Sequence, residues 1–181
     1  MAEPLRRAVF LDRDGVLIRE VNYLRRPEQV RLIKGSAEAV AGLRRAGLRV
    51  VVITNQSGVA RGYLTLATLA KVHARLRREL RAKGARLDGL YLCPHGPDEG
   101  CPCRKPKIAM IEAASKRLKL DVARSFLVGD TTTDLAAARN AGCAGLLVRT
   151  GKGGRDGKHR AKAVKTFRDL AAAARWIVER A

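Results

Sequence analysis

The sequence predicts an α/β protein, a three-layer α/β/α sandwich around a parallel sheet. Segments of helical periodicity separate short, continuous apolar runs, and acidic side chains directly follow two of these runs. Continuous apolar runs are typical of strands that are buried on both faces, and alternation with helices favours right-handed crossovers between parallel strands. The expected strands lie at 8–11, 50–53, 90–92, 126–128 and 146–148.

The expected helices lie between and after these runs. Ser36 is placed to cap a helix that ends near Gly47, and Gly84 offers a stop for a second helix. The glycine-rich segment 151–157 is expected to be a mobile loop. The apolar side chains that set the period of the second helix are Leu69, Val72, Leu76 and Leu80. Further helices are expected over 108–119, 133–141 and 166–180.

Length and composition favour one domain over 1–181. The chain has 181 residues, of which 46% are hydrophobic, enough for one sizeable core. It contains no run of about 18 apolar residues and no apolar signal segment at its start, so we expect a cytoplasmic protein with no membrane partner. The net charge of +20 favours anionic partners, with a basic C-terminal segment over 151–181.

Three carboxylates follow the ends of two predicted strands. Asp12 and Asp14 come directly after the run 8–11, and Asp130 follows the run at 126–128 and Gly129. Because ligands of open α/β sheets bind outside the carboxyl ends of the strands, these acids suit a divalent cation and a reaction on phosphate. The alternatives are a simple Asx-type turn and an EF-hand. The EF-hand fails because its twelfth loop position, which needs a glutamate, is Tyr23.

Two further polar residues also follow predicted strands or the loops after them. Thr54 follows the second apolar run, and Lys105 lies in an Arg-Lys-Pro sequence. Together with Asp134, which follows Asp130 by four residues, these groups complete a pattern that resembles the haloacid dehalogenase superfamily of phosphohydrolases. The resemblance spans about residues 8 to 150 and implies a Rossmann-like fold. No long insertion separates the first two motifs, so no large cap domain is expected.

The resemblance also implies roles for the motif residues. Asp12 is the expected nucleophile, and Asp14 the expected acid and base. Asp12 and Asp130, with the backbone carbonyl of Asp14, are the expected Mg²⁺ ligands. Thr54 and Lys105 are expected to bind the phosphate oxygens.

A second set of residues predicts a Zn²⁺ site. Cys93, His95, Cys101 and Cys103 form the pattern C-x-H-x5-C-x-C, and prolines and glycines around them indicate a tight loop over 93–103. Four ligands of this type are typical of a structural zinc site. The alternatives are disulfides, which need an oxidising compartment, and free buried thiols. Zinc in this loop would direct the adjacent residues Arg104 and Lys105 toward the active site.

Two further stretches of the sequence bear on the substrate. Within the superfamily, Val21–Leu24, Thr54–Tyr63 and the cysteine loop resemble heptose bisphosphate and histidinol-phosphate phosphatases. The short zinc loop is closer to the histidinol-phosphate pattern, whereas the Asn55–Tyr63 stretch favours the heptose branch. The expected reaction is therefore hydrolysis of a sugar phosphate, at the 7-position of heptose 1,7-bisphosphate. The expected substrate-binding residues are Asn55, Gln56, Ser57, Arg61, Arg104 and Thr131, the last at a position where heptose phosphatases often have lysine.

A competing interpretation from another class is a zinc-bearing nucleic-acid binding module, or a phosphatase that acts on nucleic-acid ends. The +20 charge and the basic segment from Lys152 to Arg168 favour it. Against it, the chain has one tryptophan, three tyrosines and three phenylalanines, so few side chains can stack on bases. We therefore expect a phosphorylated small molecule as the partner, no nucleic acid, and a monomer.

Overall fold

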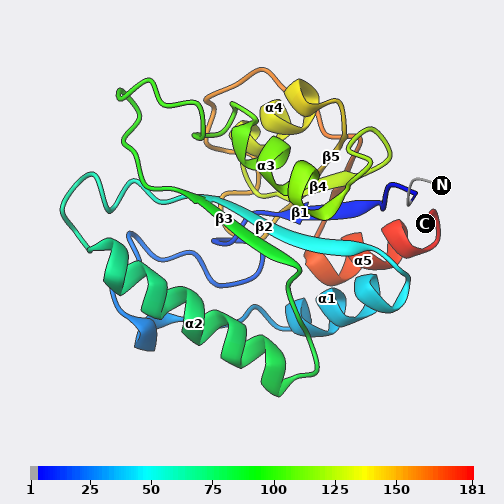
Figure 1. Ribbon diagram of the computed structural model, residues 1–181, viewed down its shortest axis with the longest axis horizontal. Helices are drawn as coiled ribbons and strands as arrows, with labels where there is room; N and C mark the ends of the chain where they lie inside the picture. Colours follow the sequence, from blue (N-terminus) through cyan, green and yellow to red (C-terminus); the bar gives the residue numbers. More distant parts are fainter. Residues whose placement is uncertain (1–3) are drawn as a thin grey trace.

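The computed structural model describes residues 4–181 and contains one six-stranded parallel sheet (Figure 1). The strand order is β3-β2-β1-β4-β5-β6. β1 therefore lies between β2 and β4, with Leu11 in register with Val52 on one side and Val128 on the other. The strands are β1 Ala8–Leu11, β2 Arg49–Asn55, β3 Gly89–Cys93, β4 Phe126–Gly129, β5 Ala144–Val148 and β6 Lys165–Phe167.

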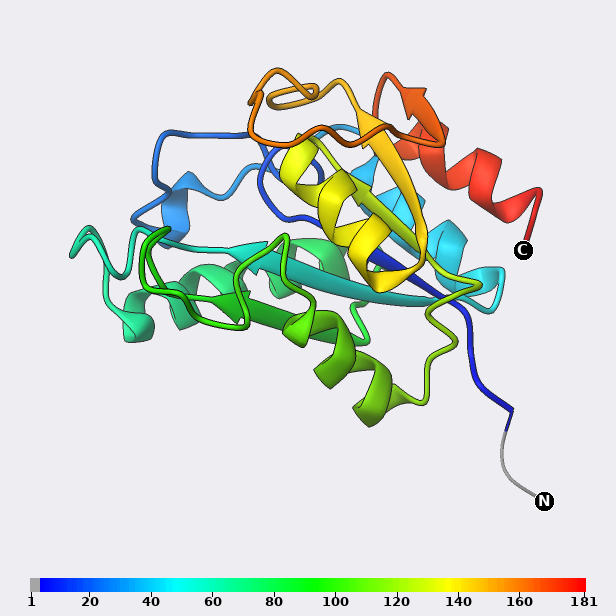
Figure 2. The same cartoon turned by 90° about the horizontal axis from the view of Figure 1, so that it is seen from above.

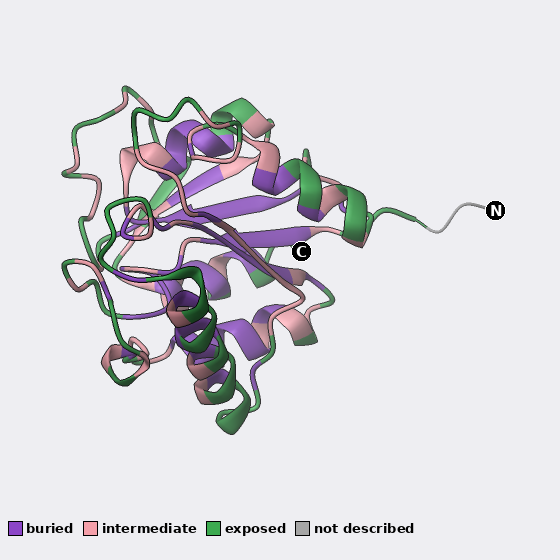
Figure 3. Cartoon of the chain, turned by 60° about the vertical axis from the view of Figure 1, so that its left-hand side comes forward, coloured by how far each residue is buried: buried purple, intermediate pink, exposed green. Residues whose placement is uncertain are grey.

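Helices cover both faces of the sheet, which confirms the predicted α/β/α sandwich (Figures 1 and 2). One face carries α1 (Ser36–Arg45), α2 (Leu66–Ala82) and α5 (Leu170–Val178), and the other carries α3 (Ala109–Leu118) and α4 (Thr132–Ala141). A 3-10 turn, η1 (Pro27–Gln29), precedes α1. Figure 3 shows the central strands β1, β2 and β4 buried and the outer faces of the helices exposed. The continuous apolar runs are thus explained by burial on both faces.

Two expectations about element ends were wrong. Ser36 is not a cap: it is the first residue of α1, Gly35 is the N-cap, and the Ser36 hydroxyl donates to the Leu17 carbonyl. The expected helix over 166–180 begins later, because Asp169 accepts a hydrogen bond from the Ala172 amide and caps α5. The residues before this cap form the short, exposed edge strand β6.

The strand order indicates where on the sheet a ligand would bind. Its two neighbours are reached by crossovers in opposite directions, so the carboxyl end of β1 is a topological switch point, where open α/β sheets bind ligands. Within the described residues, no large domain is inserted between β1 and β2, in agreement with the expected absence of a cap. No helix in the described part of the chain is long and apolar enough to cross a membrane.

Candidate active site

The centre of the site is a buried lysine between two carboxylates. Lys105 Nζ lies 2.8 Å from Asp12 Oδ1 and 2.7 Å from Asp134 Oδ1, and it also donates to the Ile53 carbonyl. Burial opposes the charge of Lys105, but Asp12 and Asp134 outweigh it and raise the pKa of the lysine above its usual value. Its ammonium group is therefore a fixed positive charge beside Asp12.

Asn55 fixes the backbone of this lysine. Its side-chain Oδ1 accepts from the Lys105 amide at 3.0 Å, and its Nδ2 donates to the Lys105 carbonyl at 3.2 Å. The paired bonds tie the end of β2 to the loop that follows the cysteines. Asn55 lines the cavity, and the structure uses its amide to hold Lys105 in place.

The Asp14 carboxylate accepts hydrogen bonds from Arg13 and Gln56. Arg13, which is 1% exposed, donates from Nη2 to Asp14 Oδ1 at 3.0 Å and from Nε to Oδ2 at 3.1 Å. Gln56 Nε2 donates to Asp14 Oδ2 and to Thr54 Oγ1, both at 2.9 Å. The amide of Gln56 therefore links the predicted acid and base to the predicted phosphate-binding hydroxyl.

Asp130 approaches the backbone so closely that only glycine fits at two positions. A Cβ on Gly15 would lie 2.5 Å from Asp130 Oδ2, and one on Gly151 would lie 2.3 Å from it. Both glycines also have positive φ, 76° and 66°. The loop expected to be mobile is thus hydrogen-bonded to the site: the Lys152 amide donates to Asp130 Oδ2 and the Gly154 amide to the Asp130 carbonyl.

The carboxylates fit a hard divalent cation. Asp12, Asp130 and Asp134 each offer an oxygen, and these atoms lie within 4.8 Å of one another. Asp130 Oδ1 is buried without a hydrogen-bond partner in the described chain, whereas both oxygens of Asp134 accept hydrogen bonds, from Lys105 and Thr131. Burial raises the pKa of Asp130 to about 8, and repulsion from Asp12 adds to the shift. A cation beside Asp12 and Asp130 would relieve this repulsion, and oxygen ligands suit Mg²⁺.

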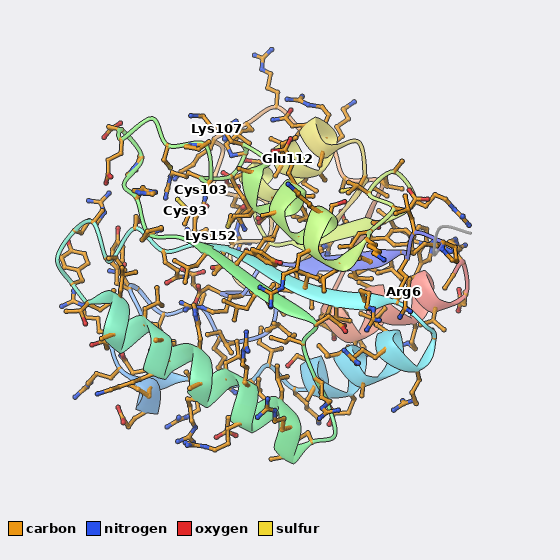
Figure 4. All side chains as sticks on the ribbon, in the orientation of Figure 1. Arg6, Cys93, Cys103, Lys107, Glu112 and Lys152 are labelled. Carbon is orange, nitrogen blue, oxygen red and sulfur yellow. The ribbon has the colours of Figure 1, made fainter. Side chains whose placement is uncertain are left out.

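The four predicted zinc ligands converge. Cys93 Sγ lies 3.5 Å from Cys101 Sγ, Cys101 Sγ lies 3.6 Å from Cys103 Sγ, and His95 Nδ1 lies 3.3 Å from Cys103 Sγ. A tetrahedral zinc site with bonds of about 2.3 Å has ligand atoms about 3.8 Å apart, close to these values. All four cysteines of the chain are free thiols, so the disulfide alternative is not realised. The donor set and its spacing therefore fit Zn²⁺ (Figure 4 labels Cys93 and Cys103).

A cavity of about 550 Å³ lies over the carboxylates and Lys105 and extends to the cysteine loop. Of the residues predicted to bind substrate, Asn55, Gln56, Ser57, Arg61, Arg104 and Thr131 all line it, together with Asp12, Asp14, Lys105 and Asp130. Thr54 is buried below it and reaches it through Gln56. Arg104 is anchored by a bond from Nη1 to the His95 carbonyl, 3.1 Å away, which ties the cavity wall to the cysteine loop. In Figure 4, Cys93 and Cys103 lie toward one end of the sheet and Arg6 toward the other.

Sequence reasoning missed several residues of this site. Arg13 and His73 form a buried pair behind Asp14, and Lys152, Lys158 and His159 line the cavity from the loop after β5. The position of Arg13 between two aspartates could have indicated a buried arginine, since a buried charge needs partners of opposite charge. His73 gave no such signal, because it lies on α2 at the spacing of an ordinary core residue. The basic segment from Lys152 was recognised in the sequence, but as support for nucleic-acid binding and not as part of this cavity.

Comparisons with known proteins agree with this geometry. Residues 9–79 match the family model for haloacid dehalogenase-like hydrolases, and residues 102–173 match a second model described as HAD-hydrolase-like. A D-glycero-beta-D-manno-heptose-1,7-bisphosphate 7-phosphatase of Pseudomonas putida is 44% identical over 172 residues, which cover 94% of this chain and 98% of that protein. The D-glycero-D-manno-heptose-1,7-bisphosphate 7-phosphatase of Thermosynechococcus vestitus is 44% identical, with 95% of each chain covered.

A solved structure gives the same answer. The D,D-heptose 1,7-bisphosphate phosphatase of B. bronchiseptica, crystallised with magnesium and phosphate, superposes with a TM-score of 0.89 at 39% identity, covering 97% of this chain and 99% of that one. The resemblance inferred from the motifs is therefore confirmed over nearly the whole chain. This protein belongs to the haloacid dehalogenase-like hydrolases, in the family that contains the heptose-1,7-bisphosphate 7-phosphatases.

Proposed function

We propose that this protein is a Mg²⁺-dependent phosphatase that removes the 7-phosphate of D-glycero-D-manno-heptose 1,7-bisphosphate. The observation that carries the proposal is the contact between Asp12 and the charged Lys105, next to the unpaired oxygen of Asp130, at the switch point of the sheet. The high identity to phosphatases named for this substrate supports the choice of sugar.

Asp12 acts as the nucleophile in this proposal. Its carboxylate attacks the phosphorus atom and forms an aspartyl-phosphate, while the bond from phosphorus to the sugar oxygen breaks. Asp14 gives its proton to the departing sugar oxygen. It then takes a proton from the water that attacks the aspartyl-phosphate, and inorganic phosphate leaves.

The remaining groups stabilise the charge on the transferred phosphoryl group. We expect Lys105 to bind its oxygens as a fixed charge and Thr54 to bind them through its hydroxyl. In the structure this hydroxyl is buried below the cavity and accepts a hydrogen bond from Gln56. Asp12 and Asp130, with the backbone carbonyl of Asp14, would hold Mg²⁺, which neutralises phosphoryl charge when it is bound.

Zinc and the cavity wall supply specificity. In this proposal Cys93, His95, Cys101 and Cys103 hold a structural Zn²⁺ that braces the loop, and Arg104 contacts the distal phosphate. Asn55, Gln56, Ser57, Arg61 and Thr131 contribute to substrate binding from the same cavity. A single domain over 1–181, a cytoplasmic location and a monomeric state remain our predictions.

The test is phosphate release by the purified protein in Mg²⁺, with heptose 1,7-bisphosphate and histidinol phosphate at matched concentrations. We expect a higher kcat/KM for the heptose bisphosphate, with ³¹P NMR locating the loss at the 7-position. A preference for histidinol phosphate would mean that the short zinc loop was the better guide. Activity on phosphorylated DNA or RNA ends, with neither small substrate cleaved, would refute the proposal.

A further inference from the structure

A buried arginine and a buried histidine lie directly behind Asp14. Arg13 is 1% exposed and His73 is 7% exposed, and Arg13 Nη1 lies 3.0 Å from His73 Nε2. His73 belongs to α2, which otherwise contributes apolar side chains to the core on this face. Neither residue has a part in the reaction as proposed above.

The chemistry of this contact fixes the state of the histidine. A guanidinium group can only donate hydrogen bonds, so His73 Nε2 must accept, and the ring must be neutral with its proton on Nδ1. Burial lowers the pKa of His73 to about 3, and the charge of Arg13 adds to the shift. His73 is therefore a neutral acceptor throughout the range of pH in which a cytoplasmic enzyme works.

The contact also fixes the orientation of the guanidinium plane. Arg13 Nη1 is held by His73, Nη2 donates to Gln56 Oε1 at 2.9 Å, and Nε and Nη2 grip both oxygens of Asp14. Each of the three nitrogens thus has a partner, which leaves the fork one orientation. Arg13, Gln56 and Asp14 all line the cavity, and the Asp14 side chain is 19% exposed, against 1% for Arg13.

We propose that His73 and Arg13 are positioning residues for Asp14: His73 fixes the Arg13 fork, and the fork holds the Asp14 carboxylate where it exchanges protons with the leaving group and with water. The inference rests on the proposed function, because it assumes that Asp14 is the acid and base of a phosphatase. Helix α2, which otherwise packs in the core, would thus contribute to the position of Asp14 through His73.

The two half-reactions provide a diagnostic. A sugar alkoxide is a poor leaving group and needs the proton of Asp14 when its bond to phosphorus breaks, whereas p-nitrophenolate leaves without one. Hydrolysis of the aspartyl-phosphate needs Asp14 as a base for either substrate. A misplaced Asp14 therefore slows both steps with a sugar phosphate but only the second step with p-nitrophenyl phosphate.

The test compares His73→Leu, which removes the acceptor, with His73→Gln, whose amide oxygen can still accept from Arg13. For His73→Leu we expect kcat on heptose 1,7-bisphosphate to fall about 10-fold or more, with KM little changed. The fall should be smaller than the full contribution of a general acid and base, about 100-fold or more, because Asp14 itself is still present. With p-nitrophenyl phosphate in a rapid-mixing experiment, the same variant should give a burst of about one nitrophenolate per active site, followed by slow turnover. His73→Gln should behave like the wild type.

Several outcomes would overturn the inference. One is His73→Leu with unchanged kcat and no burst, since His73 would then be only a core residue. Another is His73→Gln that folds normally, as judged by its thermal unfolding, yet is as slow as His73→Leu. If His73→Leu does not fold, Arg13→Lys, which keeps the charge but loses the fork, is measured for the same burst. Wild-type protein that cleaves neither ester refutes the proposed function itself, whereas an active wild type with an unaffected variant refutes only the role of His73.

Discussion

Lys105 shows how a single buried charge organises the site. It is 4% exposed, its ammonium group contacts both Asp12 and Asp134, and Asn55 holds its backbone by two hydrogen bonds. Removal of one partner from a buried ion pair leaves the other charge uncompensated, which is far more costly than the loss of an exposed pair. The side chain therefore has a structural role in the site, and in the proposed function it also binds the phosphate oxygens.

Lys105→Met should lower both activity and stability. We expect a loss of about 3 kcal/mol in the free energy of unfolding, because two buried carboxylates lose their cation, and a fall of about 100-fold or more in kcat/KM. Urea unfolding and phosphate release measure the two effects. Lys116→Met, on the exposed face of α3, is the matched control. Equal stability of the two variants would contradict the role given to Lys105.

At the residue scale, the sequence predicted which side chains gather but not how they are connected. Asp12, Asp14, Lys105 and Asp130 were predicted because each follows a strand end or its loop, and the structure brings all of them to one cavity. The bonds from Asn55 to the backbone of Lys105 could not be predicted, since they depend on the path of a loop 50 residues away. Their roles in catalysis and binding stay predictions.

The cysteine loop between β3 and α3 is the element that positions the cavity wall. Its residues between Cys93 and Ala109 form no helix or strand, so the ligand set and a few hydrogen bonds define its path. Lys107 Nζ donates to the Gly100 and Cys101 carbonyls, and Arg104 to the His95 carbonyl. A metal ion at the centre would fix the loop and, with it, Arg104 and Lys105.

Cys101→Ala should release zinc and displace this loop. We expect the purified wild type to contain about one zinc per chain, by elemental analysis, and the variant to contain much less. Its melting temperature and its kcat/KM should both fall, because metal binding contributes to folding and directs Arg104 and Lys105. Cys143→Ala, which lies outside the cluster, is the control. A Cys101→Ala protein with full stability and activity would contradict the structural role.

Among the elements, the long, strongly apolar segments were predicted best. All five predicted strands exist, and the helices that separate them lie where the periodicity indicated. The sixth strand, Lys165–Phe167, has three residues and is exposed, so it carries no apolar run to recognise. The glycine-rich loop after β5 was expected to be mobile because glycine has more backbone freedom than other residues. Its composition could not predict the hydrogen bonds that connect it to Asp130.

In the whole molecule, acidic and basic side chains are unevenly distributed around the cavity. The net charge is +20, yet the floor of the cavity collects Asp12, Asp14, Asp130 and Asp134. Basic side chains line the rim of the same cavity, among them Arg61, Arg104, Lys152 and Lys158. An acidic floor suits a cation, and a basic rim suits a phosphorylated substrate.

Mg²⁺ should stabilise the protein in a pH-dependent way. Burial raises the pKa of Asp130 from 3.8 to about 8 and that of Asp12 to about 6, so the folded state binds more protons than the unfolded state between about pH 4 and pH 8. The stability of the metal-free protein should therefore fall as the pH rises through this window. Mg²⁺ binds the ionised carboxylates and should raise the melting temperature by about 5 °C at pH 8 and much less at pH 5.

Asp130→Asn provides the control for this measurement. The variant should lose the response to Mg²⁺ at pH 8, because it lacks the carboxylate with the unpaired buried oxygen. A wild-type protein whose melting temperature responds equally to Mg²⁺ at both pH values, or a variant that keeps the full response, would place the cation elsewhere.

In the proposed reaction, Asp12 carries the phosphoryl group between its release from the sugar and its transfer to water. The most direct measurement is to mix the protein with heptose 1,7-bisphosphate and Mg²⁺, quench with acid within the first turnover, and analyse the peptides by mass spectrometry. We predict one phosphoryl group on the peptide at Asp12 in the wild type, and neither this group nor phosphate release in a folded Asp12→Asn variant. Full phosphatase activity in Asp12→Asn, or a phosphoryl group on another residue, would show that Asp12 is not the nucleophile.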